Sequence, residues 1–375
     1  MFIQKIFELD DILDYEKKIT KAKNMKITNL SHWNTSPNFQ EYMLKHIRLE
    51  QIPDIFSYRY TYDFSKDTRN RIVEKFIGKK DENIMCLLTP SSTCSITNII
   101  NYLKLHNFKK LCILTPAYFS VEENCKIFSL QYEKVPLRFE NGKYIIPMEY
   151  ISKNYFDAIW ITSPVYSTGV LYDRVQIEKL QKLMDNRVLV IADETLALPK
   201  QELSRVMPIN DYFFAIYSPH KPLYINSIKF SAIVCPIKND DFFEQWIDVL
   251  GGALLHSNIS AVMHYLSSNY TLCAQKSVEW FSKNAEIIDC ILSKFCFAWS
   301  NNSELGAYKS IHLNPLNRDS NQLCNIRNLI DTQYVSYIPG TLNGFGKKHH
   351  CFRVNLSLST SEIENALYRI LNYYA

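Results

Sequence analysis

Between about residues 84 and 236, short apolar runs alternate with segments of helical periodicity, and this alternation restricts the fold more than any other feature of the chain. The apolar runs are Ile84–Leu88, Leu111–Leu114, Tyr132–Leu137, Ala158–Thr162, Val188–Ala192, Tyr212–Tyr217 and Phe230–Cys235. We interpret each run as a strand buried on both faces, because such strands are continuously apolar rather than alternating. The segments between them with apolar residues at helical spacing are Ser95–Asn107, Val121–Leu130 and Val175–Met184.

This βαβ alternation predicts an α/β fold, with a mostly parallel, mixed sheet flanked by helices in three αβα layers. Ligands in such an architecture bind at the carboxyl ends of the strands. We therefore expect functional side chains in the segments that directly follow the predicted strands.

After residue 236 the pattern changes, because Asp240–Cys296 is compatible with helix almost throughout. Short strands are then expected, at Ile311–Leu313, Tyr334–Ile338 and Phe352–Leu358. A final helix, Ser361–Tyr374, follows a capping-box pattern of Ser359 and Glu362. We expect a small α+β domain with its linking helix in residues 256–375, a large sheet domain in 56–255, and an N-terminal segment, 1–55, packed with the small domain.

Composition limits the partners of the chain. Hydrophobic residues make up 47% of the 375 residues, charged residues make up 21%, and the net charge is +4, as is typical of a globular protein. Basic and acidic residues are interleaved, so no face suited to nucleic acid is expected. The chain has no signal-peptide pattern and no apolar run near the roughly 20 residues of a membrane helix. We expect a cytoplasmic protein without membrane association.

Glycine and cysteine usage excludes several kinds of site. Only 9 residues are glycine, and no GxxxxGK[ST] loop occurs, so a P-loop nucleotide site is excluded. The 10 cysteines form no CxxC pair and no His/Cys cluster at metal spacing, so no metal site is expected. Cys86, Cys112 and Cys235 lie within apolar runs, and we interpret them as small core residues in a reducing compartment.

Lys221 is the first candidate functional residue, because it follows a predicted buried strand in the segment Ser218-Pro219-His220-Lys221. An ammonium group is costly to bury, and a low-dielectric site lowers the pKa of a lysine and frees its amine for attack on an aldehyde. The alternative is an ordinary solvated lysine at the end of a strand.

Hydroxyl and aromatic side chains follow the first two predicted strands of the sheet. Ser91, Ser92 and Thr93 stand at the start of a predicted helix, where hydroxyls and free N–H groups bind anions. Helix capping explains the same residues without a ligand. Tyr118 follows the next strand and could stack on a flat heteroaromatic ring, although packing explains a single tyrosine equally well.

Three further segments complete the set of candidates. The loop Ser163–Gly169, which contains Tyr166, follows a predicted strand and is otherwise a plain turn. Asp193 follows another strand; it could hold a proton on a pyridine nitrogen, or hold magnesium if a P-loop were present. Lys229 opens the strand after Lys221 and could face a phosphate or solvent.

In their order along the chain, these segments resemble the class I/II aminotransferase superfamily of fold-type I pyridoxal-phosphate enzymes. The resemblance covers roughly residues 55–360, and the motifs that carry it are Thr89–Ser95, Pro116-Ala117-Tyr118, Ser163–Gly169, Asp193-Glu194, Ser218–Lys221 with Lys229, and Phe352–Ser357. It implies pyridoxal 5′-phosphate in the large domain, an amino acid and a keto acid as substrates, and a homodimer.

The resemblance also assigns roles to residues of this sequence. Lys221 would form the Schiff base and move the substrate proton, Asp193 would pair with the pyridinium nitrogen, and Tyr118 would stack on the ring. The phosphate would be held by Ser91, Ser92, Thr93 and Ser218, with Lys229 where the family usually has arginine. Arg353 would bind the substrate carboxylate. Tyr58 or Tyr60 would reach the phosphate of a neighbouring subunit.

Besides Lys229, the sequence departs from the family at three positions. Tyr166 stands where an asparagine usually contacts the ring oxygen, and Leu196 stands where a tyrosine usually does. His220, before the lysine, is atypical and could be an acid/base, a phosphate ligand or a packing residue. The missing asparagine and tyrosine leave open an elimination, cyclisation, decarboxylation or oxidation in place of transamination. The degraded phosphate motifs and the low glycine content leave open a non-catalytic protein that keeps the fold.

Overall fold

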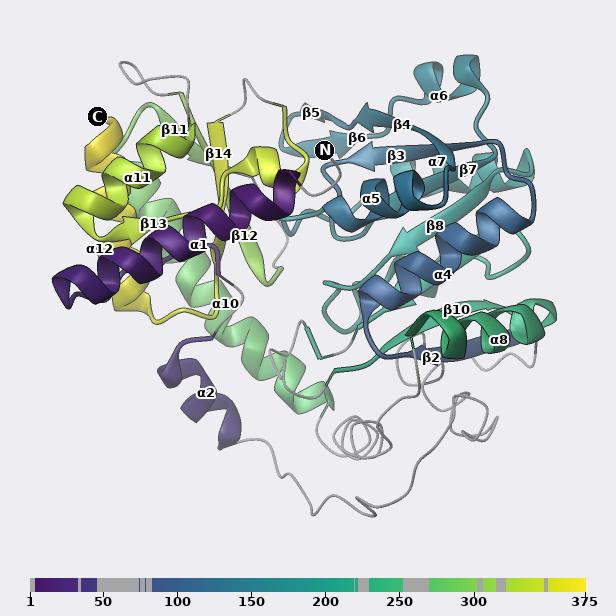
Figure 1. Cartoon of the computed structure of the whole chain (residues 1–375), viewed down its shortest axis with the longest axis horizontal. Helices are drawn as coiled ribbons and strands as arrows, with labels where there is room; N and C mark the ends of the chain where they lie inside the picture. The colour runs from purple at the N-terminus through teal and green to yellow at the C-terminus, as the bar shows by residue number, and fades with distance from the viewer. Residues whose placement is uncertain are drawn as a thin grey trace. The chain divides into compact units, whose positions relative to one another are not determined.

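The computed structural model describes residues 4–32, 35–45, 74, 78, 83–218, 220–221, 229–251, 270–301, 306–314, 322–346 and 350–375. The chain divides into two compact units (Figure 1). The large unit comprises Leu44–Tyr166 and Leu171–Gln275. The small unit comprises Met1–Met43, Ser167–Val170 and Lys276–Ala375. The short middle segment of the small unit comes from the loop that the sequence placed after a strand of the sheet.

A 7-stranded sheet in the order β2-β10-β9-β8-β7-β3-β4 forms the centre of the large unit. Its strands are β2 (Ile84–Thr89), β3 (Lys110–Thr115), β4 (Gln131–Pro136), β7 (Ala158–Thr162), β8 (Leu189–Asp193), β9 (Phe213–Tyr217) and β10 (Ser231–Pro236). Strand β10 runs antiparallel to both β2 and β9, whereas the other neighbouring strands are parallel. The predicted mixed, mostly parallel sheet is confirmed.

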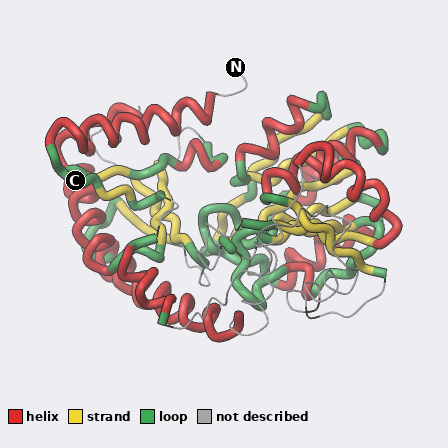
Figure 2. The backbone as a smooth tube through the Cα atoms, turned by 60° about the horizontal axis from the view of Figure 1, so that its bottom comes forward, coloured by secondary structure: helices red, strands yellow, loops and turns green. Residues whose placement is uncertain are grey.

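Helices cover both faces of this sheet (Figure 2). They are α4 (Ser92–Leu105), α5 (Phe119–Ile127), α7 (Arg174–Asp185) and α8 (Asp240–Gly251); the large unit also contains the short helix α6 (Met148–Asn154). Side chains of α4, α5 and α8 share one apolar core with alternate residues of the strands, including Trp160 and Phe214. Helix α7 packs on β8 but contributes none of its buried residues to that core, which places it on the opposite face. The three-layer α/β architecture is therefore confirmed.

The prediction that every strand is buried on both faces is wrong for β4. Most residues of β4 are exposed or half-buried, because β4 is the last strand of the sheet and, among the described residues, pairs with β3 alone. Its sequence, Gln131–Pro136, carries Glu133 and Lys134 among apolar residues, and charged residues protect an edge strand from pairing with another chain. Central strands β7, β8 and β9 are buried throughout, as predicted.

Cysteines within the apolar runs are core residues, as the sequence predicts. Cys86, Cys112 and Cys235 are fully buried in β2, β3 and β10. None of the cysteines in the described part of the chain forms a disulfide. No helix in that part is both long and apolar enough to cross a membrane.

The small unit combines helices with short strands. Its elements are α1 (Gln4–Lys23), β1 (Thr28–Asn29), α2 (Pro37–Leu44), α10 (Tyr270–Leu292), β11 (Ala298–Ser300), β12 (Tyr308–Leu313), α11 (Gln322–Gln333), β13 (Val335–Ser336), β14 (His350–Asn355) and α12 (Thr360–Tyr374). Strands β11, β12 and β14 form an antiparallel sheet, and β1 pairs with β13. The boundaries of α2 and α10 cross the division between the two units.

Several elements were not expected from the sequence. In the small unit they are α1, β1, α2, β11 and α11, and in the large unit they are α6 and the hairpin of β5 (Arg138–Glu140) and β6 (Lys143–Ile145). These elements are short or mostly polar, so they lack the long apolar periodicity that identifies the others. The strand expected at Phe352–Leu358 is shifted, because β14 begins at His350 and ends at Asn355.

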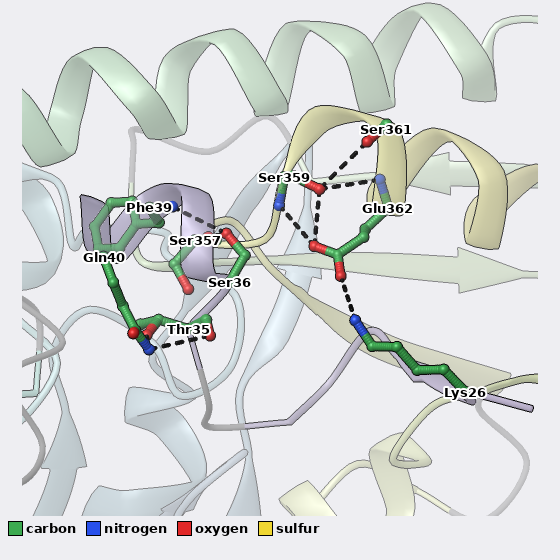
Figure 3. Close-up of polar contacts among 9 residues, drawn as sticks. All are labelled: Lys26, Thr35, Ser36, Phe39, Gln40, Ser357, Ser359, Ser361 and Glu362. Atoms are coloured by element: carbon green, nitrogen blue, oxygen red, sulfur yellow. Dashed lines mark hydrogen bonds and ion pairs between the residues drawn. The ribbon is translucent and has the colours of Figure 1, made fainter. Parts of the chain in front are cut away.

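The capping box predicted for the last helix is present at the start of α12 (Figure 3). The Glu362 amide donates to Ser359 Oγ at 3.3 Å, and the Ser359 amide donates to Glu362 Oε2 at 3.2 Å. Lys26, from the segment before β1, donates to Glu362 Oε1 at 3.1 Å. The N-terminal segment and the last helix of the small unit are thus joined at this cap.

Replacing Ser359 with alanine should lower the free energy of unfolding by about 1 kcal/mol, because the first turn of α12 loses its side-chain acceptor. Urea denaturation followed by circular dichroism measures the change. Ser361→Ala is the matched control, because Ser361 is exposed on the same turn and its hydroxyl lies 3.4 Å from Ser359 Oγ, at the limit of a hydrogen bond. Equal losses in the two variants would contradict a stabilising role of the cap.

Candidate active site

Lys221 lies just beyond the carboxyl end of β9, which is buried along its whole length. The chain turns directly after β9, where the Lys221 amide donates to the Ser218 carbonyl at 3.0 Å. Lys221 Nζ donates to Ser92 Oγ at 2.8 Å and lies 5.9 Å from the centroid of the Tyr118 ring. Three residues that the sequence selected separately, at the ends of three strands, are therefore brought together in the large unit.

The start of helix α4 has both properties that the sequence suggested. Ser91 is its N-cap and accepts from the Cys94 amide at 3.2 Å and, through its carbonyl, from the Ser95 amide at 3.0 Å. Among the described residues, no acceptor takes the amide protons of Ser92 and Thr93. The positive end of the helix dipole lies at the same place, so this turn can bind an anion such as a phosphate.

Asp193 is the last residue of β8 and is only 3% exposed. Burial raises the pKa of its carboxyl, whereas the hydrogen bonds from Thr195 and the charge of Lys221 oppose that rise. Both the amide of Thr195, at 3.1 Å, and the hydroxyl of Thr195 donate to Asp193 Oδ1. No donor among the described residues reaches Oδ2, which can therefore accept from an N–H group of a ligand. Sequence reasoning missed Thr195, whose position two residues after Asp193 suits an Asx-type turn.

Glu194 follows Asp193 and is also buried. Its two carboxyl oxygens each accept a hydrogen bond from Ser204, one from the amide and one from the hydroxyl, both at 2.7 Å. The Ser204 hydroxyl is also hydrogen-bonded to the Tyr217 hydroxyl. Burial raises the pKa of Glu194 to about 7. Glu194 thus joins the loop after β8 to the last residue of β9, four residues before Lys221.

Hydroxyl groups also connect the Lys221 segment with β10 and α4. Ser218 Oγ donates to Ser231 Oγ at 3.0 Å, and Ser95 Oγ donates to the same atom at 3.1 Å. Ser231 Oγ donates in turn to the Tyr217 carbonyl. His220 is 3% exposed, and its Nδ1 lies 2.8 Å from the Phe230 carbonyl oxygen.

The remaining candidates of the large unit surround these groups. Tyr166 is buried, and its ring centroid lies 6.0 Å from that of Tyr118. Lys229 is exposed at the start of the segment that enters β10. Leu196 is buried beyond Asp193 and offers no polar atom in its side chain. Tyr58 and Tyr60 lie outside the described residues.

Arg353 belongs to β14 of the small unit and is also 3% exposed. Its guanidinium carbon lies 4.5 Å from the centroid of the Tyr308 ring. Nε and Nη2 both donate to the Ser31 carbonyl, and Nη1 donates to Ser167 Oγ, each at 3.4 Å. Stacking on an aromatic ring and contacts with neutral oxygens hold the guanidinium in a fixed orientation, as recognition of a carboxylate requires.

Comparison with known proteins supports the same architecture. No protein-family model and no curated protein sequence matches the chain. Solved structures do match. An aspartate aminotransferase mutant of Thermus thermophilus has a TM-score of 0.79 and 14% identity, over 98% of this chain and 96% of that one. A methionine aminotransferase of Escherichia coli has a TM-score of 0.77 and 12% identity, over 96% of each chain. N-succinyldiaminopimelate aminotransferase of Mycobacterium tuberculosis has a TM-score of 0.77 and 14% identity, also over 96% of each chain.

The chain has the aminotransferase fold. The resemblance to class I/II aminotransferases of fold type I, inferred from motif order, is confirmed for the fold over nearly the whole chain. Within this aminotransferase fold, Lys221, Ser92, Tyr118 and Asp193 lie at the carboxyl end of the sheet, where the architecture places ligands.

A surface cavity of about 490 Å³ lies elsewhere in the aminotransferase fold, beside the edge strand β4. It is lined by Lys134, Val135, Pro136, Arg138, Pro147, Glu149, Tyr150 and Lys153. None of the site residues selected from the sequence is among them. In the described part of the chain, no group of three His, Cys, Asp or Glu side chains could hold a metal ion.

The stability of this protein should depend on the charge of Glu194. The pKa of Glu194 rises from its ordinary value of 4.5 to about 7 on folding, so the folded state holds the proton more tightly than the unfolded chain. This contribution is complete below pH 4.5, is lost as the pH rises through about 7, and amounts to roughly 3 kcal/mol. The glutamine of the variant Glu194→Gln cannot ionise, so the free energy of unfolding of this variant should not decrease in the same way as the pH rises through about 7.

Urea denaturation of both proteins between pH 4.5 and 8 measures the difference. Glu178→Gln, an exposed glutamate on α7, is the matched control and should follow the wild type. A difference between wild type and Glu194→Gln that stays constant across this range would show that Glu194 does not titrate near neutral pH.

Proposed function

We propose that this chain is a pyridoxal-phosphate-dependent aminotransferase. The observation that carries the proposal is the position of Lys221 Nζ, which is hydrogen-bonded to Ser92 at the anion-binding start of α4 and lies near the ring of Tyr118. When bound, pyridoxal phosphate supplies an aldehyde that takes up amines and a ring that withdraws electrons from the substrate. The neighbouring solved aminotransferases support this choice of cofactor.

The residues of the large unit fit such a group. The amides of Ser92 and Thr93 and the hydroxyls of Ser91 and Ser92 would bind its phosphate, with Lys229 as an additional cation. Asp193 would accept the pyridine N–H through Oδ2, because Thr195 already occupies Oδ1. A carboxylate so buried favours a partner that brings positive charge, because burial alone raises its pKa.

Lys221 would anchor the cofactor and, once displaced by the substrate, would move a proton at the substrate Cα. Tyr118 would cover one face of the ring. Tyr166 would contact the ring oxygen with its hydroxyl, in place of the asparagine that the family usually has. Arg353 would bind the carboxylate of an amino acid and of the keto acid formed from it. We also propose a cytoplasmic homodimer, as is common for this fold.

A second reaction class is favoured by two observed side chains. Leu196 is buried and apolar, and Tyr166 replaces an amide, so the ring oxygen lacks both of its usual partners. Those partners help to set the proton affinity of the bound cofactor. A changed affinity would suit an elimination, cyclisation, decarboxylation or oxidation of an amino acid.

Product stoichiometry distinguishes the two reaction classes. An aminotransferase incubated with an amino acid but no keto acid should release about one product per site and then stop, because the amino group remains on the cofactor. Adding a keto acid should restore continuous turnover. A panel of amino acids assayed by mass spectrometry measures this, and many turnovers without a keto acid would overturn the proposal in favour of the second class.

Lys221→Ala should lose the visible absorption band of the bound cofactor and at least 10³-fold in turnover, as expected for removal of a nucleophile that also transfers protons. Borohydride reduction followed by peptide mass spectrometry should find the cofactor on Lys221 in the wild type. Lys153→Ala, on an exposed face of α6, is the control and should keep both properties. Wild-type activity in Lys221→Ala would exclude the proposal.

Arg353→Lys should raise KM for the amino acid about 10- to 100-fold with a smaller effect on kcat, because lysine keeps the charge but loses the planar pair of donors. Steady-state kinetics measures the change. Arg327→Lys on the exposed side of α11 is the matched control. An unchanged KM in Arg353→Lys would show that Arg353 does not bind the substrate carboxylate.

A further inference from the structure

We propose that His220 is a positioning residue that, with Ser218, clamps the Lys221 segment to the start of β10, and that it is neither an acid/base nor a phosphate ligand. The inference rests on the proposed function, because it concerns how the lysine that anchors the cofactor is held. It concerns contacts within the large unit only, all of them among described residues.

The hydrogen bond of His220 determines which ring nitrogen carries the proton. Nδ1 lies 2.8 Å from the carbonyl oxygen of Phe230. A carbonyl oxygen can only accept, so Nδ1 must donate. In the neutral ring the other nitrogen, Nε2, then has a lone pair and no proton. A phosphate oxygen is also an acceptor, so neutral His220 in this tautomer has no proton to offer it.

The surroundings of His220 keep the ring neutral. Burial and, to a smaller extent, the positive charges of Lys221 and Lys229 lower the pKa of His220 to about 4, although the hydrogen bond to Phe230 opposes this shift. The imidazolium form, with a proton on both nitrogens, is therefore scarce at neutral pH. A group that stays neutral cannot exchange protons with a substrate in that range.

The clamp continues the pairing of β9 with β10 beyond the end of the strand. The backbone register between these strands ends at the pair Tyr217 and Ala232. One step further, Ser218 Oγ donates to Ser231 Oγ at 3.0 Å. Beyond that, the His220 side chain reaches the Phe230 carbonyl. Where the chain turns away from the sheet, side-chain hydrogen bonds thus replace the backbone hydrogen bonds between β9 and β10.

This arrangement links the two lysines that the proposed function uses. Lys221 directly follows His220, and Lys229 directly precedes Phe230. Holding His220 against Phe230 therefore fixes the backbone of one lysine relative to that of the other. It also restricts Ser218: its only hydroxyl proton is given to Ser231, so in this arrangement Ser218 supports the clamp and does not donate to a phosphate.

Two isosteric variants separate the possible roles. The amide nitrogen of asparagine lies close to the place of Nδ1, whereas that of glutamine lies close to the place of Nε2. His220→Asn should keep the bond to Phe230 and bind pyridoxal phosphate within about twofold of wild type. His220→Gln should lose that bond and bind about tenfold more weakly, since one buried hydrogen bond contributes up to about that factor.

The measurements are cofactor affinity by titration of the apoprotein, the fraction trapped on Lys221 by borohydride, and kcat and KM between pH 5.5 and 8.5. We expect the asparagine variant to match wild type in all three, with no new inflection in either pH profile. We expect Ser218→Ala to weaken cofactor binding, and its effect to add less than fully to that of His220→Gln, because both residues hold the same segment.

Each contrary result overturns the inference. Wild-type affinity in His220→Gln with a loss in His220→Asn would identify a phosphate contact through Nε2. A pH inflection present in wild type and absent from both variants would identify an acid/base. Equal behaviour of all three proteins would exclude any clamp.

The unfolding midpoint of the apoprotein distinguishes failure of the clamp from failure of the proposed function. The bond from His220 to Phe230 exists without a ligand, so His220→Gln should unfold at a lower temperature than wild type and His220→Asn should not. If wild type binds no pyridoxal phosphate, the proposed function fails, and these midpoints still decide whether the clamp exists. Equal midpoints would overturn the clamp.

Discussion

Strands β7, β8 and β9 are buried on both faces, so polar side chains are accommodated only at the ends of these strands. Parallel neighbours end at the same edge of the sheet, and the polar groups that follow them must therefore meet there. Asp193 ends β8, and Lys221 follows β9 by four residues. The chemistry proposed for the protein depends on this crowding of polar groups at one edge of an apolar sheet.

Strand β10 makes this edge more constrained than a purely parallel sheet would. It returns antiparallel between β2 and β9, so its first residues lie beside the carboxyl ends of both. Ser231, the first residue of β10, accepts hydrogen bonds from Ser218 after β9 and from Ser95 in α4. One buried network of hydrogen bonds thereby holds three segments: the start of α4, the segment Ser218–Lys221 and the start of β10. Removing any hydroxyl of this network should change the position of Lys221.

Much of the large unit could be predicted from the sequence because its strands are long apolar runs. The fold class and the mixed, mostly parallel character of the sheet are confirmed, whereas the order of the strands across the sheet came only from the structure. The prediction that β4 is buried on both faces was wrong. Its charged residues are explained by its place at the edge of the sheet, which only the structure shows. Helix α11 was missed because more than half of its residues are polar, and strand β11 because it is only three residues long; packing against neighbours in the small unit determines their form.

The sequence by itself determined which side chains lie at the ends of the strands, because hydrophobic periodicity fixes where each strand stops. It also determined the cap of α12, which depends on residues three apart. Only the tertiary structure decided which of these ends meet and which atoms they share: Lys221 with Ser92, Ser218 with Ser231, and His220 with Phe230. Those contacts join strands distant in sequence or fix a tautomer, and neither is encoded in local spacing. For the same reason, the neighbours of His220 in the sequence could not show its role. Its hydrogen bond to Phe230 depends on the pairing of β10 with β9.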